Sequence, residues 1–295
     1  MTGIYSSREG RQEILRRYRE ILTRWPVANE RMEIPTRQGD TSVIVSGPVG
    51  APPLVLLHGS GTNSVMWMGD VSTWAEHFRV HAVDLIGEPG LSAQSRPPLT
   101  SDAYALWLDE VLDGLDLTET VSIVGASLGG WMAVDYASRH PGRIERLALL
   151  CPGGIGRQKA SFAFKAMFLM MLGSWGMRRT LTLAMGSAPS TSAPADDAYL
   201  AYAVSIFKHF KPRREKLPVF TDSALKALTM PVLVIVGGRD AMLDSRDTKR
   251  RLEQTTPHAI VHLLPDAGHG LRGQTAVILD FLRDTHHTHE RTPDA

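Results

Sequence analysis

Short apolar runs that alternate with amphipathic segments constrain the fold of this chain more than any other feature. Six runs are rich in Val, Ile and Leu and show little polar alternation: 54–57, 78–85, 121–124, 144–150, 232–236 and 260–264. Strands of this composition are covered on both faces, as in parallel sheets. Helical patterns lie between them, so we expect an α/β fold with helices on both faces of a mainly parallel sheet.

The segments between the runs carry apolar residues at helical spacing. They predict helices over 65–77, 102–115, 128–139, 243–254 and 275–284. Residues 31–34 and 42–45 instead alternate between polar and apolar, with Gly39 and Asp40 between them. This pattern predicts an antiparallel hairpin at the edge. The hairpin and the six buried runs together give a mostly parallel sheet of eight strands.

One long stretch interrupts the alternation of strands and helices. No buried strand is evident from residue 153 to residue 228, where Met and aromatic residues are concentrated. We expect 153–228 to form a helical cap inserted into an α/β core made of 27–152 and 229–289. The apolar side chains of the cap would pack it onto the core, line an adaptable pocket, or do both.

Residues 1–26 carry apolar side chains at helical spacing among Arg and Glu. We expect an amphipathic helix packed on the domain, and the alternative is an anchor lying on a membrane surface. The segment is too charged for a signal peptide, and no run of about 20 uncharged apolar residues occurs in the chain. No stable membrane insertion is therefore expected, and the predicted location is the cytoplasm.

The charge balance and the cysteine count exclude several classes of protein. The 295 residues include 32 Lys and Arg and 31 Asp and Glu, which gives a net charge of +1. A dedicated nucleic-acid binder would carry a basic excess, so no nucleic-acid partner is expected. Cys151 is the single cysteine, so neither an internal disulfide nor a cysteine-based zinc site can form. We expect no metal and no cofactor.

The segment 121–131 carries the strongest chemical signal. An apolar strand runs into Gly125-Ala-Ser127-Leu-Gly129, and an amphipathic helix follows. A nucleophile held on a sharp turn between strand and helix has crowded backbone neighbours, and glycines two residues away on either side relieve that crowding. The positive end of the helix lies beneath the hydroxyl. Ser127 is therefore the candidate nucleophile, whereas a bare GxSxG elsewhere would carry little weight.

A serine hydroxyl needs a general base, and the base needs an acid. His269 follows the last buried run, on a loop expected at the carboxyl end of its strand. Asp240 follows the run 232–236 in the same way, and such strand ends face the same crevice as Ser127. Asp244 and Asp247 are the alternative acids, placed on the next helix. His262 lies within the last run and is expected to be packed.

The oxyanion hole and the substrate pocket require further residues. The run 54–57 leads into His58-Gly59-Ser60-Gly61, whose small residues allow the backbone to turn its N–H groups toward the site. The expected donors are the backbone N–H groups of Ser60 and Leu128. His58 is expected to brace the loop rather than to act as a second base. The pocket is expected to include five residues: Gly59, Trp67, Met167, Met171 and Trp175.

From about residue 30 to residue 285 the chain resembles the α/β-hydrolase-fold serine hydrolases of the carboxylesterase and lipase type. The resemblance rests on His58-Gly59, the loop 84–92, the GASLG segment, Gly238-Arg-Asp240 and Gly268-His269. The ASLGGW and GEPGLS segments are similar to those of bacterial carboxylesterase-like members with a helical cap. The loop after Asp84 is one residue longer than the usual pattern of the family, which leaves the role of Glu88 open: it faces either the pocket or solvent.

The order Ser127, Asp240, His269 matches the nucleophile-acid-base order of that superfamily. The resemblance implies cleavage of a carboxylic ester of a small molecule through an acyl-enzyme. A lactone, a thioester or a C–C bond beside a carbonyl is the alternative substrate for the same residues. A small-molecule receptor on a hydrolase fold is the alternative of another class. Neither the substrate nor the oligomeric state follows from the sequence.

Overall fold

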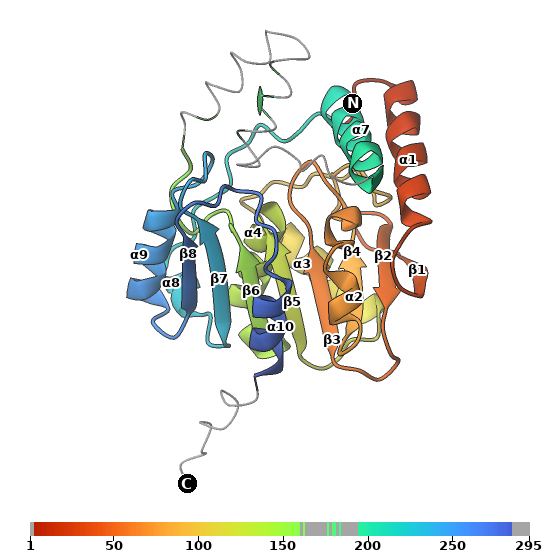
Figure 1. The fold of residues 1–295 in the computed structure, drawn as a ribbon. Coiled ribbons are helices and arrows are strands. Elements are labelled where there is room, and N and C mark those ends of the chain that lie inside the picture. The colour runs from red at the N-terminus through yellow and green to blue at the C-terminus, as the bar shows by residue number, and fades with distance from the viewer. Residues whose placement is uncertain are drawn as a thin grey trace.

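The computed structural model describes residues 3–159 and 194–284, together with positions 162, 176, 179, 180 and 183. The described part contains one sheet of eight strands in the order β1-β2-β4-β3-β5-β6-β7-β8 (Figure 1). The hairpin of β1 (Asn29–Ile34) and β2 (Thr41–Ser46) forms one edge, and β2 is antiparallel to both of its neighbours.

All the other pairings in the sheet are parallel. They join β4 (Arg79–Val83), β3 (Pro53–Leu57), β5 (Val121–Ala126), β6 (Ile144–Leu150), β7 (Val232–Gly237) and β8 (Ile260–Leu264). The predicted mostly parallel, eight-stranded sheet is confirmed.

Burial along the strands follows their place in the sheet. Every residue of β5 and β7 is buried, because both strands have neighbours on both sides and helices on both faces. No residue of β8 is fully buried, because this strand is the other edge of the sheet. His262 lies on β8 and is exposed, so its prediction as a packed histidine is wrong. An apolar run alone does not distinguish an edge strand from a central one.

Helices cover the two faces of the sheet and divide the core into two clusters. The first face carries α3 (Ala103–Gly114), α4 (Leu128–Arg139), α8 (Asp222–Lys226) and α9 (Ser245–Thr255). The opposite face carries α1 (Arg8–Leu22), α2 (Val71–Trp74) and α10 (Thr275–Arg283). Along β3, Val55 and Leu57 face the first cluster and Leu54 and Leu56 the second, as the two-residue period of a strand requires.

The helix predicted over residues 65–77 is two short elements in the structure. A 3₁₀ turn, η1 (Ser64–Trp67), begins at Asn63, whose side chain caps it, and α2 follows after a break. Asp70 stands at the break and accepts a hydrogen bond from the hydroxyl of Thr275, which begins α10. A contact between residues 205 positions apart therefore overrides the local helical pattern. A second 3₁₀ turn, η2 (Pro141–Arg143), precedes β6.

The long connection between β6 and β7 contains α7 (Pro194–His209), which lies beside α1 in Figure 1. The ring of Tyr18 in α1 stacks on that of Tyr202 in α7, with centroids 6.2 Å apart. Tyr5 forms a β-bridge with Phe210 at the end of α7. The apolar side of α1 is buried in these contacts, so it packs on the domain rather than facing a membrane. Among the described residues, no helix is long and apolar enough to span a bilayer.

We expect Tyr18→Phe to lower the free energy of unfolding by about 1.5–3 kcal/mol, because hydrogen bonds to charged groups contribute about that much. The Tyr18 hydroxyl donates to the buried Asp84 carboxyl group at 2.7 Å. Urea unfolding measures the change. Arg19→Ala, on the exposed side of the same helix, is the matched control and should stay within about 0.5 kcal/mol of the wild type. Equal stability of Tyr18→Phe and the control would contradict the prediction.

Candidate active site

Ser127 stands at the turn between β5 and α4 with a backbone φ of +50°. This left-handed conformation is unusual for a residue with a side chain and typical of a strained functional position. The backbone packs very closely around it. A Cβ at Gly125 would lie 2.8 Å from the Gly129 carbonyl oxygen, and a Cβ at Gly129 would clash with the carbonyl oxygens of Leu57 and His58. The two glycines are therefore required where the sequence has them.

The structure brings together the three polar residues that the sequence predicts. The Ser127 hydroxyl lies 2.9 Å from Nε2 of His269. On the other side of the same ring, Nδ1 lies 2.7 Å from Oδ2 of Asp240. The loops after β5, β7 and β8 supply these residues, because the carboxyl ends of parallel strands meet at one edge of the sheet. The arrangement is that of a nucleophile, a general base and an orienting acid.

Asp240 is buried, and its second oxygen is also occupied. Oδ1 accepts hydrogen bonds from the backbone amides of Met242 at 2.7 Å and Leu243 at 3.0 Å. Burial alone would raise the pKa of Asp240, but the hydrogen bond from His269, the charge of that ring and the two amides outweigh it and lower the pKa. The carboxylate therefore stays charged and holds the proton of the imidazole on Nδ1. Asp244 instead caps α9, where its side chain accepts from the Asp247 amide.

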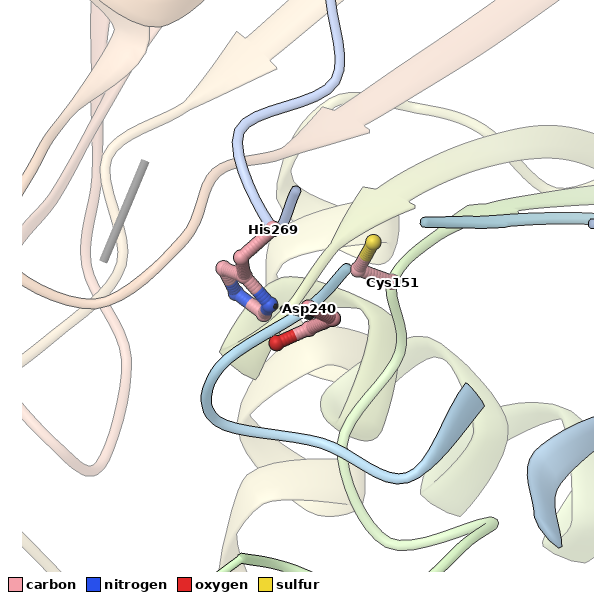
Figure 2. Close-up of side chains that lie close together, drawn as sticks. All are labelled: Cys151, Asp240 and His269. Atoms are coloured by element: carbon pink, nitrogen blue, oxygen red, sulfur yellow. Dashed lines mark hydrogen bonds and ion pairs between the residues drawn. The ribbon is translucent and has the colours of Figure 1, made fainter. Parts of the chain in front are cut away.

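Figure 2 shows Cys151 beside Asp240 and His269, and one potential ligand atom from each of the three lies within 4.8 Å of the others. Burial, followed by the nearby Asp240 charge, raises the pKa of the thiol, so it is protonated and a poor ligand. Two ligands of one tetrahedral zinc ion would stand ~3.3 Å apart. The 2.7 Å between Nδ1 of His269 and Oδ2 of Asp240 is shorter and fits a shared proton. The cluster fits an acid–base pair better than a metal site.

The loop after β3 forms the opposite wall of the site. A Cβ atom at Gly59 would lie 3.6 Å from the Cβ atom of Ser127. The backbone at Gly59 therefore lies directly beside the candidate nucleophile. Leu128 is the first residue of α4, and an N–H in the first turn has no carbonyl partner within its helix. His58 is buried, contacts the Gly59 carbonyl with Nδ1 and accepts from the Leu85 amide with Nε2. Burial lowers its pKa, so it stays neutral and braces the loop.

Glu88, whose role the sequence leaves open, does not face solvent. Its side chain is buried under the loop that contains Ser60. Oε2 accepts hydrogen bonds from the Gly61 amide at 2.6 Å and from the Ser60 hydroxyl at 3.2 Å. The only sequence signal for this contact is the extra residue in the loop after Asp84.

Asp84 connects the N-terminal helix to the loops of the site, a role that sequence reasoning did not find. Its buried Oδ1 accepts from the Tyr18 hydroxyl and from both the amide and the hydroxyl of Ser64, and Oδ2 accepts from the Leu91 amide at 2.8 Å. These bonds fix the start of η1 and the segment that follows Glu88. Because a buried carboxyl group with four donors must keep them all in place, Asp84 limits the motion of this side of the site.

The five residues predicted to line the pocket lie in different places. Gly59 lies next to Ser127, as described above. Trp67 is in the core instead: its buried ring lies 5.9 Å from that of Trp74, because η1 directs it onto the sheet rather than toward the site. Met167, Met171 and Trp175 lie outside the described residues.

Comparison with known proteins shows the family to which the chain belongs. Residues 54–279 match the model of the alpha/beta hydrolase family, and the chain belongs to that family. It is 31% identical over 265 residues to carboxylesterase YbfK of Bacillus subtilis. The aligned residues cover 85% of this chain and 86% of the relative. The crystal structure of YbfK superposes on this chain with a TM-score of 0.79 at 29% identity. The superposition covers 93% of this chain and 99% of the YbfK chain.

Two further relatives bear on the substrate class. The crystal structure of naproxen esterase from Bacillus subtilis superposes with a TM-score of 0.77 at 29% identity, over 90% of this chain and 94% of the other. The chain is also 29% identical over 278 residues to 2-hydroxy-6-oxononadienedioate/2-hydroxy-6-oxononatrienedioate hydrolase of Cupriavidus pinatubonensis. That match covers 84% of this chain and 94% of the relative.

We expect Gly129→Ala to lower the free energy of unfolding by about 3 kcal/mol or more, because the added methyl group meets backbone oxygens that cannot yield without moving β3. Urea denaturation followed by circular dichroism measures the change. Gly142→Ala is the matched control, since a Cβ there meets nothing within 4 Å. If the two variants are equally stable, the close packing at the turn does not exist.

Proposed function

We propose that this protein hydrolyses carboxylic esters of small molecules through an acyl-enzyme on Ser127. The observation that carries the proposal is the continuous hydrogen-bonded chain from Asp240 through His269 to the Ser127 hydroxyl. Two further observations support it: the family membership of the chain and its similarity to proteins named as carboxylesterases.

The first half of the reaction acylates the enzyme. Ser127 Oγ attacks the ester carbonyl carbon while its proton passes to Nε2 of His269, and Asp240 stabilises the imidazolium that forms. The carbonyl oxygen becomes an oxyanion, for which the backbone N–H groups of Ser60 and Leu128 are the proposed donors. The tetrahedral intermediate then expels the alcohol, which takes its proton from His269.

The second half releases the acid. A water molecule gives a proton to His269 and attacks the acyl carbon, and a second oxyanion forms in the same place. Its collapse returns the proton to Ser127 and frees the carboxylic acid. All the proton transfers run through one ring, so the cycle needs no group beyond the residues described.

A second candidate substrate is a C–C bond beside a carbonyl, cleaved by the same three residues. The observation that favours it is the similarity to a hydrolase whose named substrate carries a ketone and two carboxylates and no ester. The ester is preferred because the two structural matches near 29% identity described above are both esterases by name. Lactones and thioesters are further substrates of the same chemistry.

We expect Ser127→Ala to reduce hydrolysis of p-nitrophenyl esters by about 10⁴-fold or more without unfolding the chain, because the variant has no nucleophile. A fluorophosphonate probe should label the wild type, and peptide mapping should locate the label on Ser127. Esters of two to twelve carbons then measure the acyl range. Labelling without ester turnover would favour a C–C, lactone or thioester substrate. The absence of both would favour a non-catalytic receptor.

The acid is tested by a matched pair of variants. Asp240→Asn should lower kcat by about 10²–10⁴-fold, because the amide cannot hold the correct tautomer of His269. Asp244→Asn should leave kcat within about two-fold, since Asn caps a helix as well as Asp does. Steady-state kinetics on one p-nitrophenyl ester compares them. Equal losses in the two variants would remove Asp240 from its proposed role.

A further inference from the structure

The Glu88 side chain is an unusual group to find beside the active site. Its exposed fraction is 1%, and one of its carboxyl oxygens, Oε1, has no hydrogen-bond partner among the described residues. Burial of a carboxylate that is only half satisfied is unfavourable unless other interactions offset it. A residue of this kind is expected where a specific contact requires it.

The contact that Glu88 makes is with the loop opposite the nucleophile. Its Oε2 accepts from the Gly61 amide at 2.6 Å and from the Ser60 hydroxyl at 3.2 Å. Gly61 has a φ of +71°, so the chain turns sharply directly after Ser60. Ser60 is exposed to solvent on one side of the turn. On the other side, the Glu88 carboxylate accepts both of the side-chain hydrogen bonds described for Ser60 and Gly61. The direction of the Ser60 N–H therefore depends on where Glu88 holds Gly61.

We propose that Glu88 is a positioning residue: its carboxylate fixes the Ser60–Gly61 turn so that the Ser60 N–H points at the oxyanion that develops above Ser127. The inference rests on the proposed function. The hydrogen bonds described for the Glu88 side chain go to the turn, and none of them goes to Ser127, Asp240 or His269. It acts through the turn, and its effect should be largest in the transition state, when the oxyanion carries its charge.

The charged form of Glu88 is the competent one. Burial, the largest effect, raises the pKa of Glu88 to about 7, although the bonds from Gly61 and Ser60 and the charges of Arg96 and Arg213 lower it. Below that pH the protonated group is a weaker acceptor for the Gly61 amide. Neither arginine forms an ion pair with Glu88 among the described residues. Arg96 donates to the backbone carbonyls of Gly87 and Lys211, and Arg213 donates to the Pro97 carbonyl and pairs with Glu215.

Two phenols near Glu88 do not change their charge in this pH range. Burial raises the pKa values of the Tyr5 and Tyr104 phenols to about 12, so both stay neutral. Glu215 pairs with Arg213 at the surface at 2.9 Å. A loss of activity as the pH falls through about 7 is therefore expected from the protonation of Glu88.

The experiment compares kcat, KM and the pH profile of the wild type, Glu88→Gln and Glu88→Ala on one p-nitrophenyl ester. Glu88→Gln keeps the shape and one acceptor but removes the charge, and kcat should fall about 10-fold with KM within about two-fold. Glu88→Ala should lower kcat by ~10²-fold, the effect of losing one oxyanion donor. The acid limb of the kcat profile should contain one ionisation fewer in Glu88→Gln than in the wild type. Glu215→Gln, at the exposed end of the same charge cluster, should match the wild type.

A kcat and a pH profile of Glu88→Gln equal to those of the wild type would overturn the proposal. So would a loss confined to KM, which would place Glu88 in substrate binding instead. If Glu88→Ala fails to fold, Glu88→Gln, which keeps the size of the side chain, is sufficient for the test. Failure of the proposed function is recognised separately: the wild type would then give no fluorophosphonate label on Ser127, and the inference about Glu88 would fall with it.

Discussion

The close approach of α4 to the ends of β3 and β5 is the constraint on which the rest of the site depends. Ser127 can hold its strained backbone only because Gly129 lets the helix meet the carbonyl oxygens of Leu57 and His58. The Gly129 amide donates to the His58 carbonyl, and the Ser127 amide donates to the Leu150 carbonyl of β6. The turn is thus tied to the strands on both sides, and the nucleophile is placed before any substrate arrives.

The other parts of the site lie on opposite sides of the turn at Ser127. The loops after β7 and β8 bring Asp240 and His269 to the hydroxyl. On the other side, the loop after β4 carries two buried acids with separate tasks: Asp84 holds η1 and α1, and Glu88 holds the turn at Gly61. A pair of acids four residues apart therefore joins the outer helix to the wall that faces the nucleophile.

The parts of the molecule that the sequence predicts well are those that depend on local pattern. The strand runs, the glycines around Ser127, and the placing of Asp240 and His269 directly after strands all follow from short segments. Long-range contacts decided the rest. Trp67 turns into the core because Asp84 holds the start of η1, β8 is exposed because it has one neighbour, and Glu88 is buried because a distant loop folds over it. None of these is visible within a window of neighbouring residues.

The docking of α1 has a consequence for the order of folding. Tyr5 and Phe210 are 205 positions apart, and Tyr18 meets Tyr202 across a similar separation. At a synthesis rate of about 5–20 residues per second, roughly 10–40 s pass between the emergence of α1 and that of its partner. During that interval the helix displays its apolar side to whatever surrounds the ribosome. The apolar side of α1 is therefore not fully covered until α7 has been made, and the nascent chain exposes this segment to aggregation in the meantime.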